Sequence, residues 1–492
     1  MKRKEHEILL NRQGAAIALL RRKGFRTIAP GGAGSGRSWY VRPSGGSYGA
    51  EDGTSYTNAW DGFSNIVWAS IMPGDTLYVC GTHTQLLTVG ASGNAALYIK
   101  IKSFTADAGV ISGSLSRTQC VNANGRTYIE FDGLELLNST DANLYLQDGT
   151  FIVRNIVTHG ATGTGAQGFQ NETGTIATYY NCESYSNTDD GLSLHVNAQV
   201  TAYDCIFRNN SQGVNGISTS QFTAYRCNFY SNSTSDLQPD SDANFTATNC
   251  FFQSTTGPNA NSTVQLKVYN SILNNSNAVA AVLGNLLLQE CTLLGTSGIT
   301  SNNSVTANRC YIKSSKNNQL LTSGAGSMTM NYCVINAQAA VNVMAHGSSG
   351  TFVVNNGTAK CINNTSGVCI NATADGFTAN NFIVTVFQNA VTVAATKTVT
   401  WNNVDIFNVT LKKFGAGTLT ETGTLTGDPK LNNPSGDDFS LQAGSAAIDA
   451  GINTGIATGI ASASWGDTTP TYPVVTTATQ GATYDLGAYI YN

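Results

Sequence analysis

Tyr180-Asn-Cys182-Glu-Ser, Tyr203-Asp-Cys205-Ile-Phe and Tyr225-Arg-Cys227-Asn-Phe are three versions of one short text, and this repetition decides the fold. The text recurs at intervals of about 22 residues, a period typical of repeat architectures. We call the recurring position the slot, and asparagine or glycine occupies it where cysteine is missing. The slots are Gly133, Asn155, Cys182, Cys205, Cys227, Cys250, Asn270, Cys291, Cys310, Cys333, Asn356, Asn381 and Asn403.

Each repeat reads as a short strand that alternates between two faces. Tyr203, Cys205 and Phe207 alternate with Asp204 and Ile206. An alternation of period two predicts that one face is buried. We therefore expect the first three side chains to face the core.

Asparagine recurs five residues after the slot, and this predicts a corner in each repeat. Asparagine tolerates left-handed backbone and hydrogen-bonds its own turn. The asparagines at this position are Asn187, Asn210, Asn232 and Asn275.

A repeat unit this short, made of strands and turns, cannot bury its face alone, but stacked copies can. The repeat therefore predicts a parallel β-helix whose coils lie about 4.8 Å apart, so that thirteen slots span about 60 Å. A β-propeller would need a repeat of about 40 residues.

We expect four parts: 1–37, an N-terminal segment and glycine-rich linker; 38–110, a cap and first coils; 111–430, regular coils; and 431–492, a closing segment.

The composition supports an all-β protein. Only 11% of the 492 residues are charged, against about a quarter in ordinary globular proteins, and surface helices usually need such charge. The apolar fraction of 41% argues against charge-driven disorder. The net charge of −4 predicts no nucleic-acid partner, and no apolar run reaches the roughly 18 residues of a membrane span.

Two stretches resemble the right-handed parallel β-helix repeat proteins, the pectate-lyase-like superfamily. The opening text is Tyr40-Val-Arg-Pro-Ser-Gly-Gly, with Pro73-Gly-Asp-Thr-Leu-Tyr-Val further on. The closing text is Phe439-Ser-Leu-Gln-Ala-Gly-Ser-Ala-Ala-Ile-Asp-Ala-Gly, followed by Asp485-Leu-Gly-Ala-Tyr. The resemblance implies a single-stranded right-handed parallel β-helix. It does not select an activity, because the superfamily includes lyases, glycosidases, epimerases and non-catalytic phage spikes.

The eleven cysteines predict a ladder of buried thiols rather than disulfides or a zinc site. Seven of them share the inward slot, and a free cysteine behaves as a small buried hydrophobe. A row of close thiols favours folding in a reducing cytoplasm, and no Cys-x-x-Cys pair occurs. We predict no metal site and no cofactor. The one alternative is a Ca²⁺ site formed by the carboxylates of Asp236, Asp240 and Asp242. We expect these residues to form an ordinary loop instead.

The first 37 residues differ from the rest in charge. They carry a surplus of seven positive charges, whereas the remaining residues carry an excess of eleven negative charges. Residues 1–24 read as a short basic helix, and they lack the cleavage site of a secretory signal. With the linker at 29–37 they resemble the anchor of a phage virion appendage. The anchor residues we expect are Lys2, Arg3, Lys4, Leu9, Leu10, Leu19, Leu20, Arg21, Arg22 and Lys23.

The densest polar cluster is Asn187-Thr-Asp189-Asp190-Gly-Leu-Ser-Leu-His195. It resembles the Asp-Asp-Gly turns of β-helix polysaccharide enzymes. Paired carboxylates serve as acid and base in glycosidic cleavage, and His195 would assist. The alternative is that both carboxylates only cap a turn.

A second candidate is the outward face of the slot strands. We expect Glu183 and Asp204 to lie one coil apart and to form an acid pair. The side chains that would bind sugar by hydrogen bonds and ring stacking are Tyr185, Arg208, Arg226 and Tyr230. An ordinary face of ion pairs is the alternative.

Three alternative functions follow from this sequence. The first is a tailspike-like or fibre-like phage virion protein, assembled in the host cytoplasm, that binds other virion proteins through its N-terminus. Such a protein would bind a host surface glycan, could also depolymerise it, and would form a homotrimer as the spikes it resembles do. The second is a secreted-type polysaccharide lyase or glycosidase, and the third is a structural virion component without a ligand.

Overall fold

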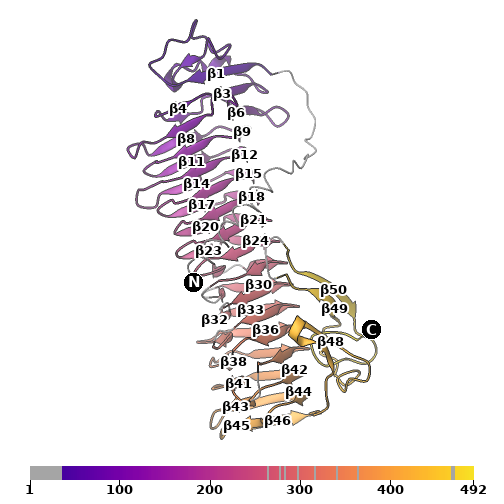
Figure 1. Ribbon diagram of the computed structural model, residues 1–492. Helices are drawn as coiled ribbons and strands as arrows, with labels where there is room; N and C mark the ends of the chain where they lie inside the picture. Colours follow the sequence, from indigo (N-terminus) through magenta and orange to yellow (C-terminus); the bar gives the residue numbers. More distant parts are fainter. Residues whose placement is uncertain are drawn as a thin grey trace, which may run out of the picture. The chain divides into compact units, whose positions relative to one another are not determined.

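A computed structural model describes residues 36–492 except 263–264, 276–278, 282–283, 296–297, 315–316, 340–341, 363–364, 467–470 and 492. The predicted basic helix and the anchor residues lie outside this part of the chain. Gly36–Asn492 forms one compact unit, a parallel β-solenoid of about 16 turns (Figure 1). The all-β parallel solenoid predicted from the repeat is confirmed. No helix in the described residues is long and apolar enough to span a membrane.

The larger sheet, sheet A, has two parallel ladders that run the length of the solenoid. The first ladder contains β1 (Ser38–Arg42), β3 (Thr76–Val79), β6 (Ile99–Ser103), β9 (Ile129–Asp132), β12 (Thr150–Arg154), β15 (Ile176–Tyr180), β18 (Gln199–Tyr203), β21 (Gln221–Tyr225), β24 (Asn244–Thr248), β27 (Leu266–Tyr269), β30 (Asn285–Gln289), β33 (Ser304–Asn308), β36 (Ser327–Asn331), β39 (Phe352–Asn355), β42 (Phe377–Thr385), β44 (Thr398–Phe407) and β46 (Thr418–Thr422).

The second ladder of sheet A contains β4 (Thr82–His83), β7 (Val110–Ser112), β10 (Glu135–Leu137), β13 (Val157–His159), β16 (Glu183–Tyr185), β19 (Ile206–Arg208), β22 (Asn228–Tyr230), β25 (Phe251–Gln253), β28 (Ile272–Leu273), β31 (Thr292–Gly295), β34 (Tyr311–Ser314), β37 (Val334–Ala337) and β40 (Thr358–Lys360). It ends on the second halves of β42 and β44. At the N-terminal end, β2 (Trp60–Asp61) pairs with β1, and two short 3-10 helices, Phe63–Asn65 and Trp68–Ser70, follow it.

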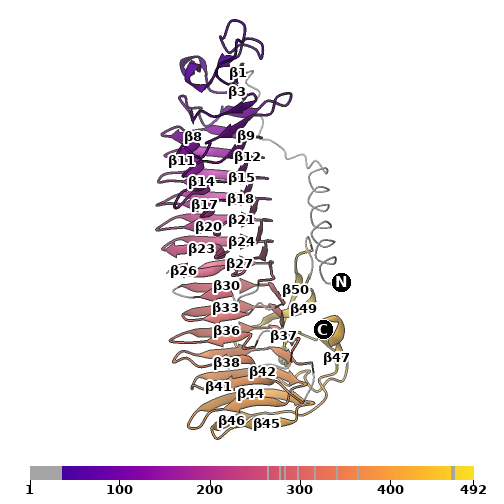
Figure 2. The same ribbon diagram turned by 60° about the vertical axis from the view of Figure 1, so that its left-hand side comes forward.

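Sheet B forms the opposite side of each coil (Figure 2). Its strands are β5 (Leu87–Thr88), β8 (Gln119–Asn124), β11 (Ala142–Gln147), β14 (Gln167–Asn171), β17 (Asp190–Leu194), β20 (Gln212–Gly216), β23 (Ser235–Ser241), β26 (Asn259–Ser262), β29 (Val279–Ala281), β32 (Ile299–Ser301), β35 (Leu320–Thr322), β38 (Asn342–His346), β41 (Val368–Ala372), β43 (Asn389–Val393) and β45 (Leu411–Phe414).

A single left-handed residue makes the corner between the two ladders of sheet A. The corner residues all have positive φ, and they are Gly133, Asn155, Asn181, Asp204, Arg226, Asn249, Asn270, Glu290, Arg309, Tyr332, Asn356, Asn381 and Asn403. Asparagine suits this corner because it tolerates left-handed backbone. The following residue points into the core, as Cys182, Cys205 and Cys227 do.

This geometry corrects the predicted slot by one residue. The asparagine slots and Gly133 are corners, so the residues that continue the cysteine column are the next ones along, such as Leu134 and Ile156. The corner also breaks the predicted alternation. Ala202 is the buried residue before the corner, and Tyr203 is only half-buried on the outside. The prediction that Tyr203 faces the core with Cys205 is therefore wrong.

The second corner is also displaced by one residue from the prediction. Ser186, Asn209 and Ser231 have positive φ, whereas the asparagine after each of them is buried inside the solenoid. The backbone N–H of Asn187 donates to Oδ1 of Asn210 at 3.1 Å, and that of Asn210 donates to Oδ1 of Asn232 at 3.2 Å. A buried amide needs such partners, so the recurring asparagine supplies an internal hydrogen-bond ladder.

The C-terminal segment, 428–466 and 471–491, folds back along the outer side of sheet A (Figures 1 and 2). It includes β47 (Leu431–Asn433), the 3-10 helix Pro434–Gly436, β48 (Asp438–Leu441), and the hairpin of β49 (Thr458–Ser464) and β50 (Val474–Thr479). Its apolar side chains bury Tyr311, Tyr332 and Val334 of sheet A.

Corner asparagines help to hold this segment. Asn381 and Asn403 each donate a hydrogen bond of 2.6 Å to a carbonyl of the segment, at Ile452 and Ala450 respectively. The corner residue therefore has a second use at this end of the solenoid.

Candidate functional site

Glu183 and Asp204, the predicted acid pair of sheet A, each accept hydrogen bonds from an arginine. Glu183 Oε1 accepts a hydrogen bond of 2.7 Å from Nε of Arg208. Asp204 accepts two hydrogen bonds of 2.8 Å from Arg226. Each carboxylate is thus matched by a guanidinium on the following coil, which leaves the two acids as members of separate ion pairs.

Aromatic rings cover the same face in stacked columns. The guanidinium of Arg208 lies 4.0 Å from the ring centroid of Tyr185, which stacks on His159 at 4.8 Å. In the next column, Tyr203 stacks between Tyr180 and Tyr225. Tyr230 adjoins Arg208 in the strand register. These rings stack mainly on one another. The aromatic side chains of this face therefore stabilise sheet A through contacts within the chain.

Asp189, Asp190 and His195 lie on the opposite side of the coil, at sheet B. Asp190 begins β17 and pairs in register with Gln212 of the next coil. Only 2% of its surface is exposed, and its Oδ1 accepts no hydrogen bond within the described chain. Burial, with the Asp189 carboxylate as a smaller cause, raises the pKa of Asp190 well above its ordinary value. It is therefore an acid that keeps its proton more readily than a solvated aspartate.

Asp189 is half-buried at the corner that leads into β17. Burial raises the pKa of this carboxyl as well. Backbone hydrogen bonds place it in one column with residues of neighbouring coils: Asp189 N–H donates to the Ala166 carbonyl at 3.0 Å. The next member of the column is Asp141, because Gln167 N–H donates to the Asp141 carbonyl at 2.8 Å.

Asp141 is a further carboxyl that the sequence reasoning missed. Burial raises its pKa, the Glu172 carboxylate adds to this effect, and His195 opposes it. The backbones of Asp141 and Asp189 stand two coils apart, or about 9.6 Å, with the buried Ala166 at the same position of the coil between them. The dipeptide Thr140-Asp141 repeats as Thr188-Asp189, a signal that could have identified the pair.

His195 contacts a different acid from the predicted ones. Its Nδ1 lies 3.4 Å from Oε1 of Glu172. The same Glu172 oxygen accepts a hydrogen bond of 2.7 Å from Nε2 of Gln170. The histidine is therefore positioned by the preceding coil, at the C-terminal end of β17.

A repeated dipeptide explains how Asp190 reaches this face. Gln167-Gly168, Asp190-Gly191 and Gln212-Gly213 begin three successive strands of sheet B, each one coil further along the solenoid. A Cβ at Gly191 would lie 2.7 Å from Nδ2 of the internal Asn210, so glycine is required on the inner side. Asp190 takes the outer position that glutamine holds in the neighbouring coils.

The residues considered for Ca²⁺ do not converge. Residues 235–241 form β23 rather than a loop, and Asp236 points into the core while Asp240 lies on the outer side. Within the part of the chain that the structure describes, no group of three or more His, Cys, Asp or Glu residues is arranged to hold a metal ion.

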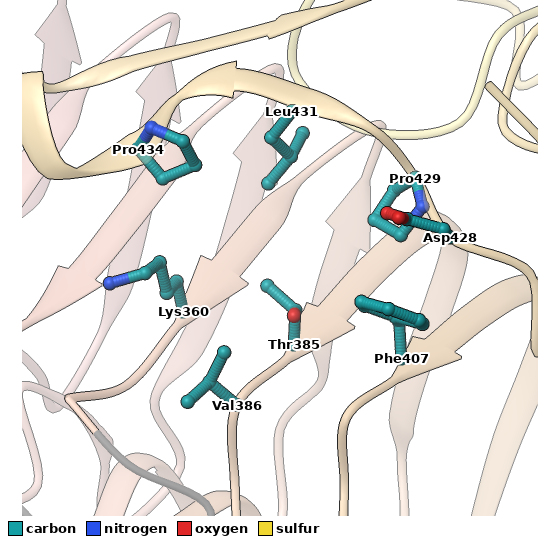
Figure 3. A pocket seen from close by; sticks show the side chains of 8 residues that line it. All are labelled: Lys360, Thr385, Val386, Phe407, Asp428, Pro429, Leu431 and Pro434. Atoms are coloured by element: carbon teal, nitrogen blue, oxygen red, sulfur yellow. The ribbon is translucent and has the colours of Figure 1, made fainter. Parts of the chain in front are cut away.

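A pocket of about 160 Å³ lies between β40, β42 and β44 and the C-terminal segment (Figure 3). Lys360 and Asp428 stand on opposite sides of it, and its walls are mainly apolar, with Phe407 and Leu431 among them. It is remote in sequence from every predicted site residue, and it brings together one cation, one carboxylate and the hydroxyl of Thr385.

Comparison with known proteins gives only distant resemblances. No protein-family model and no curated protein sequence matches the chain. Among solved structures, pectate lyase Pel9A is similar at 14% identity and a TM-score of 0.33, covering 94% of this chain and 98% of that one. XylC in complex with xylose matches at 8% identity and a TM-score of 0.33, over 80% of this chain and 87% of that one.

A lacto-N-biosidase from Eubacterium ramulus matches at 8% identity with a TM-score of 0.23, over 79% of this chain and 67% of that one. TM-scores this low do not establish that the coils superpose. We therefore draw no functional conclusion from these three structures, and the assignment to the parallel β-helix fold rests on the solenoid itself.

Proposed function

We propose that this chain binds a polysaccharide along the outer side of sheet B and hydrolyses it with Asp141 and Asp189. The observation that carries the proposal is the column Asp141–Ala166–Asp189, in which two half-buried carboxyls flank a small residue. Their separation of about two coils leaves room for a sugar ring and a water molecule.

The surroundings of the two carboxyls suggest different roles. Asp189 adjoins Asp190, a buried acid, and burial favours its own protonated form. Burial and then the Glu172 carboxylate raise the pKa of Asp141 as well, but there His195 opposes the shift. Two carboxyls in unlike surroundings are what acid–base catalysis of glycoside cleavage requires.

In the proposed reaction, Asp189 donates its proton to the glycosidic oxygen as the bond from that oxygen to the anomeric carbon breaks. Asp141 accepts a proton from water, and the water oxygen bonds to the anomeric carbon. One water molecule is consumed and the proton count balances. A wide separation of the carboxyls favours inversion at the anomeric carbon.

Hydrolysis is a better match to this site than elimination. A lyase needs a base of the lysine or arginine type, and the strands of sheet B from β5 to β43 contain neither. Arg117, whose carbonyl accepts the Thr140 N–H at 2.8 Å, stands one coil from Asp141, but its Nε donates to the Thr84 carbonyl.

We place this activity on a phage virion appendage that binds a host surface glycan, with residues 1–37 as its anchor. The basic composition of that segment and the reduced thiol ladder support this context. The homotrimer predicted from the resemblance to phage spikes remains part of the same proposal.

Incubation of the full chain with a panel of polysaccharides tests the activity. We expect release of reducing ends without the ultraviolet absorbance of unsaturated uronates. Asp189→Asn and Asp141→Asn should each lower the rate by at least about a hundredfold, and NMR of the first product should show the inverted anomer. Asp204→Asn, on sheet A, is the matched control. Equal activity of the wild type and both sheet B variants would refute the assignment.

A further inference from the structure

The C-terminal segment places a carboxylate against a lysine and an asparagine of sheet A. Lys313 of β34 and Asn336 of β37 are register partners on adjacent coils, so their backbones lie about 4.8 Å apart. Asp437 follows the 3-10 helix Pro434–Gly436 of the segment. Its Oδ2 accepts a hydrogen bond of 2.7 Å from Nζ of Lys313, and its Oδ1 accepts one of 3.1 Å from Nδ2 of Asn336. One carboxylate therefore bridges an amine and a carboxamide.

The surroundings of these three side chains are largely aromatic. Tyr311 is 1% exposed and Asn336 is 4% exposed, and the ring of Trp465 stacks on that of Tyr311 with centroids 5.2 Å apart. The hydroxyl of Tyr311 donates to Asp437 and accepts a hydrogen bond of 3.0 Å from Nδ2 of Asn336. Both N–H groups of the amide are thus engaged, which holds its nitrogen toward Asp437.

Partial burial prepares the lysine and the aspartate for a proton transfer. Their side chains are 30% and 26% exposed. Desolvation disfavours the charged form of each group, so it lowers the free-energy cost of moving a proton from Nζ of Lys313 to Asp437. The remaining exposure leaves a path by which a small product can reach the solvent.

We propose that Lys313 and Asn336 form an amide bond between their side chains, with Asp437 as the acid–base catalyst. The bond from Nζ to Cγ of Asn336 forms, and the bond from Cγ to Nδ2 breaks. Oδ2 of Asp437 takes a proton from Nζ and Oδ1 delivers one to the leaving nitrogen, along the hydrogen bonds already present. The lysine ammonium and the carboxamide become a secondary amide and an ammonium ion. Asp437 ends as a carboxylate, so the step balances without an oxidant or a co-reactant.

The new bond ties two neighbouring coils of the solenoid together beneath the C-terminal segment. Because Asp437 belongs to that segment, the bond forms only after the segment has docked on sheet A. A covalent tie also restricts the unfolded chain, as other cross-links do. The inference concerns sheet A and is independent of the glycan hydrolysis proposed for sheet B.

Mass spectrometry of the denatured full chain tests the bond. We expect a mass lower than that of the sequence by one molecule of ammonia, and a tryptic digest should contain one branched peptide that carries both Lys313 and Asn336. Lys313→Arg and Asp437→Asn should each restore the sequence mass. Lys360→Arg is the matched control, because Lys360 is the other register partner of Asn336 but belongs to the pocket of Figure 3. It should retain the branched peptide.

A wild-type chain with the full mass of its sequence would overturn the proposal and leave an ion pair beneath the segment. Loss of ammonia without a branched peptide would also overturn it, because an asparagine that closes to a succinimide loses ammonia as well. A branched peptide that persists in Asp437→Asn would overturn the role of Asp437. Both decisive readings on the wild type hold even where a variant fails to fold.

Discussion

Ser254 donates a hydrogen bond to Asp236 inside the solenoid, where two neighbouring positions on adjacent coils depart together from the repeat. The internal ladder runs through Asn187, Asn210 and Asn232, and the next coil has Ser254 in place of asparagine. On the coil before that of Ser254, Asp236 replaces the glycine found at the equivalent position of β20. The smaller serine leaves the room that the larger aspartate fills.

This exchange predicts a compensated pair of variants. Ser254→Asn should overpack against Asp236 and lower the stability by about 1–3 kcal/mol. Asp236→Gly should cost a similar amount, because the amides of Asn232 and Asn275 lose the acceptor they share at 3.0 Å. The double variant restores the pattern of the preceding coils, so it should be more stable than the sum of the single effects by about 1 kcal/mol or more.

Thermal unfolding of the wild type, the two single variants and the double variant measures this coupling. Ser349→Asn, at an exposed serine of a distant turn, is the control for the added amide. Strict additivity of the single effects would show that the two departures are independent.

The ion pairs of sheet A predict a second set of outcomes. Glu183→Gln should leave glycan hydrolysis within about twofold of the wild type, because Glu183 is engaged by Arg208 on the face opposite the proposed site. Its effect on stability should stay below about 1 kcal/mol, as for most surface pairs. Parallel assays of hydrolysis and unfolding check both statements. A loss of activity in a stably folded Glu183→Gln protein would move the site to sheet A.

The fold could be predicted because the cysteine spacing survives in the sequence. Cys182, Cys205 and Cys227 fill equivalent inward positions, and the period alone fixes the stacking. The one-residue error at the asparagine slots has a physical cause. Each inward cysteine follows a left-handed corner residue, and asparagine is favoured at that corner. The corner asparagines and the inward cysteines therefore looked like one series, although they occupy two adjacent positions of the repeat.

The candidate site could be predicted only in part. Asp189 and Asp190 stood out as a local cluster, but their alignment with Asp141 depends on coil lengths that vary along the chain. The inward direction of Asp236 depends on the register of β23, which no local pattern reveals. The C-terminal segment does not follow the repeat. Its contact with Tyr311 and Tyr332 therefore could not be predicted from the period of the sequence.

The thiol ladder predicts slow chemical labelling of the folded protein. All eleven cysteines are free and buried, and burial raises the pKa of Cys80 and of Cys120 to about 12. A thiol reagent at pH 8 should therefore label the native chain far more slowly than the chain in denaturant, which should take up eleven equivalents. Mass spectrometry of both samples gives the count. Rapid native labelling of several cysteines would contradict the buried ladder.

The last prediction concerns Asp405 of β44, which the C-terminal segment covers. Asp405 is fully buried. Neither of its carboxyl oxygens has a hydrogen-bond partner within the described part of the chain. Burial and then the Asp428 carboxylate raise its pKa from 3.8 to about 7. Asp428 and Lys360 are the charged side chains of the adjoining pocket.

A carboxyl whose pKa is raised by folding binds its proton more tightly in the folded state. Its contribution therefore favours the docked segment most at low pH, declines as the pH rises from about 4 to about 7, and stays constant above that range. The amides of Ile452 and Gly487, which donate to Oδ1 and to the carbonyl of Asn381 across the contact, both at 2.8 Å, should exchange faster at pH 8 than at pH 5 after correction for intrinsic exchange.

Asp405→Asn removes the titrating group and should make this corrected exchange independent of pH, with a gain in docking free energy at pH 8 of about 1–3 kcal/mol. Asp375→Asn, at an exposed carboxylate away from the contact, should retain the wild-type pH dependence. A wild-type segment that exchanges equally at both pH values would show that Asp405 is already ionised in the docked state. Lys360 on the far side of the pocket would then be the cation to test for compensation, by Lys360→Met, because loss of that charge should restore the pH dependence.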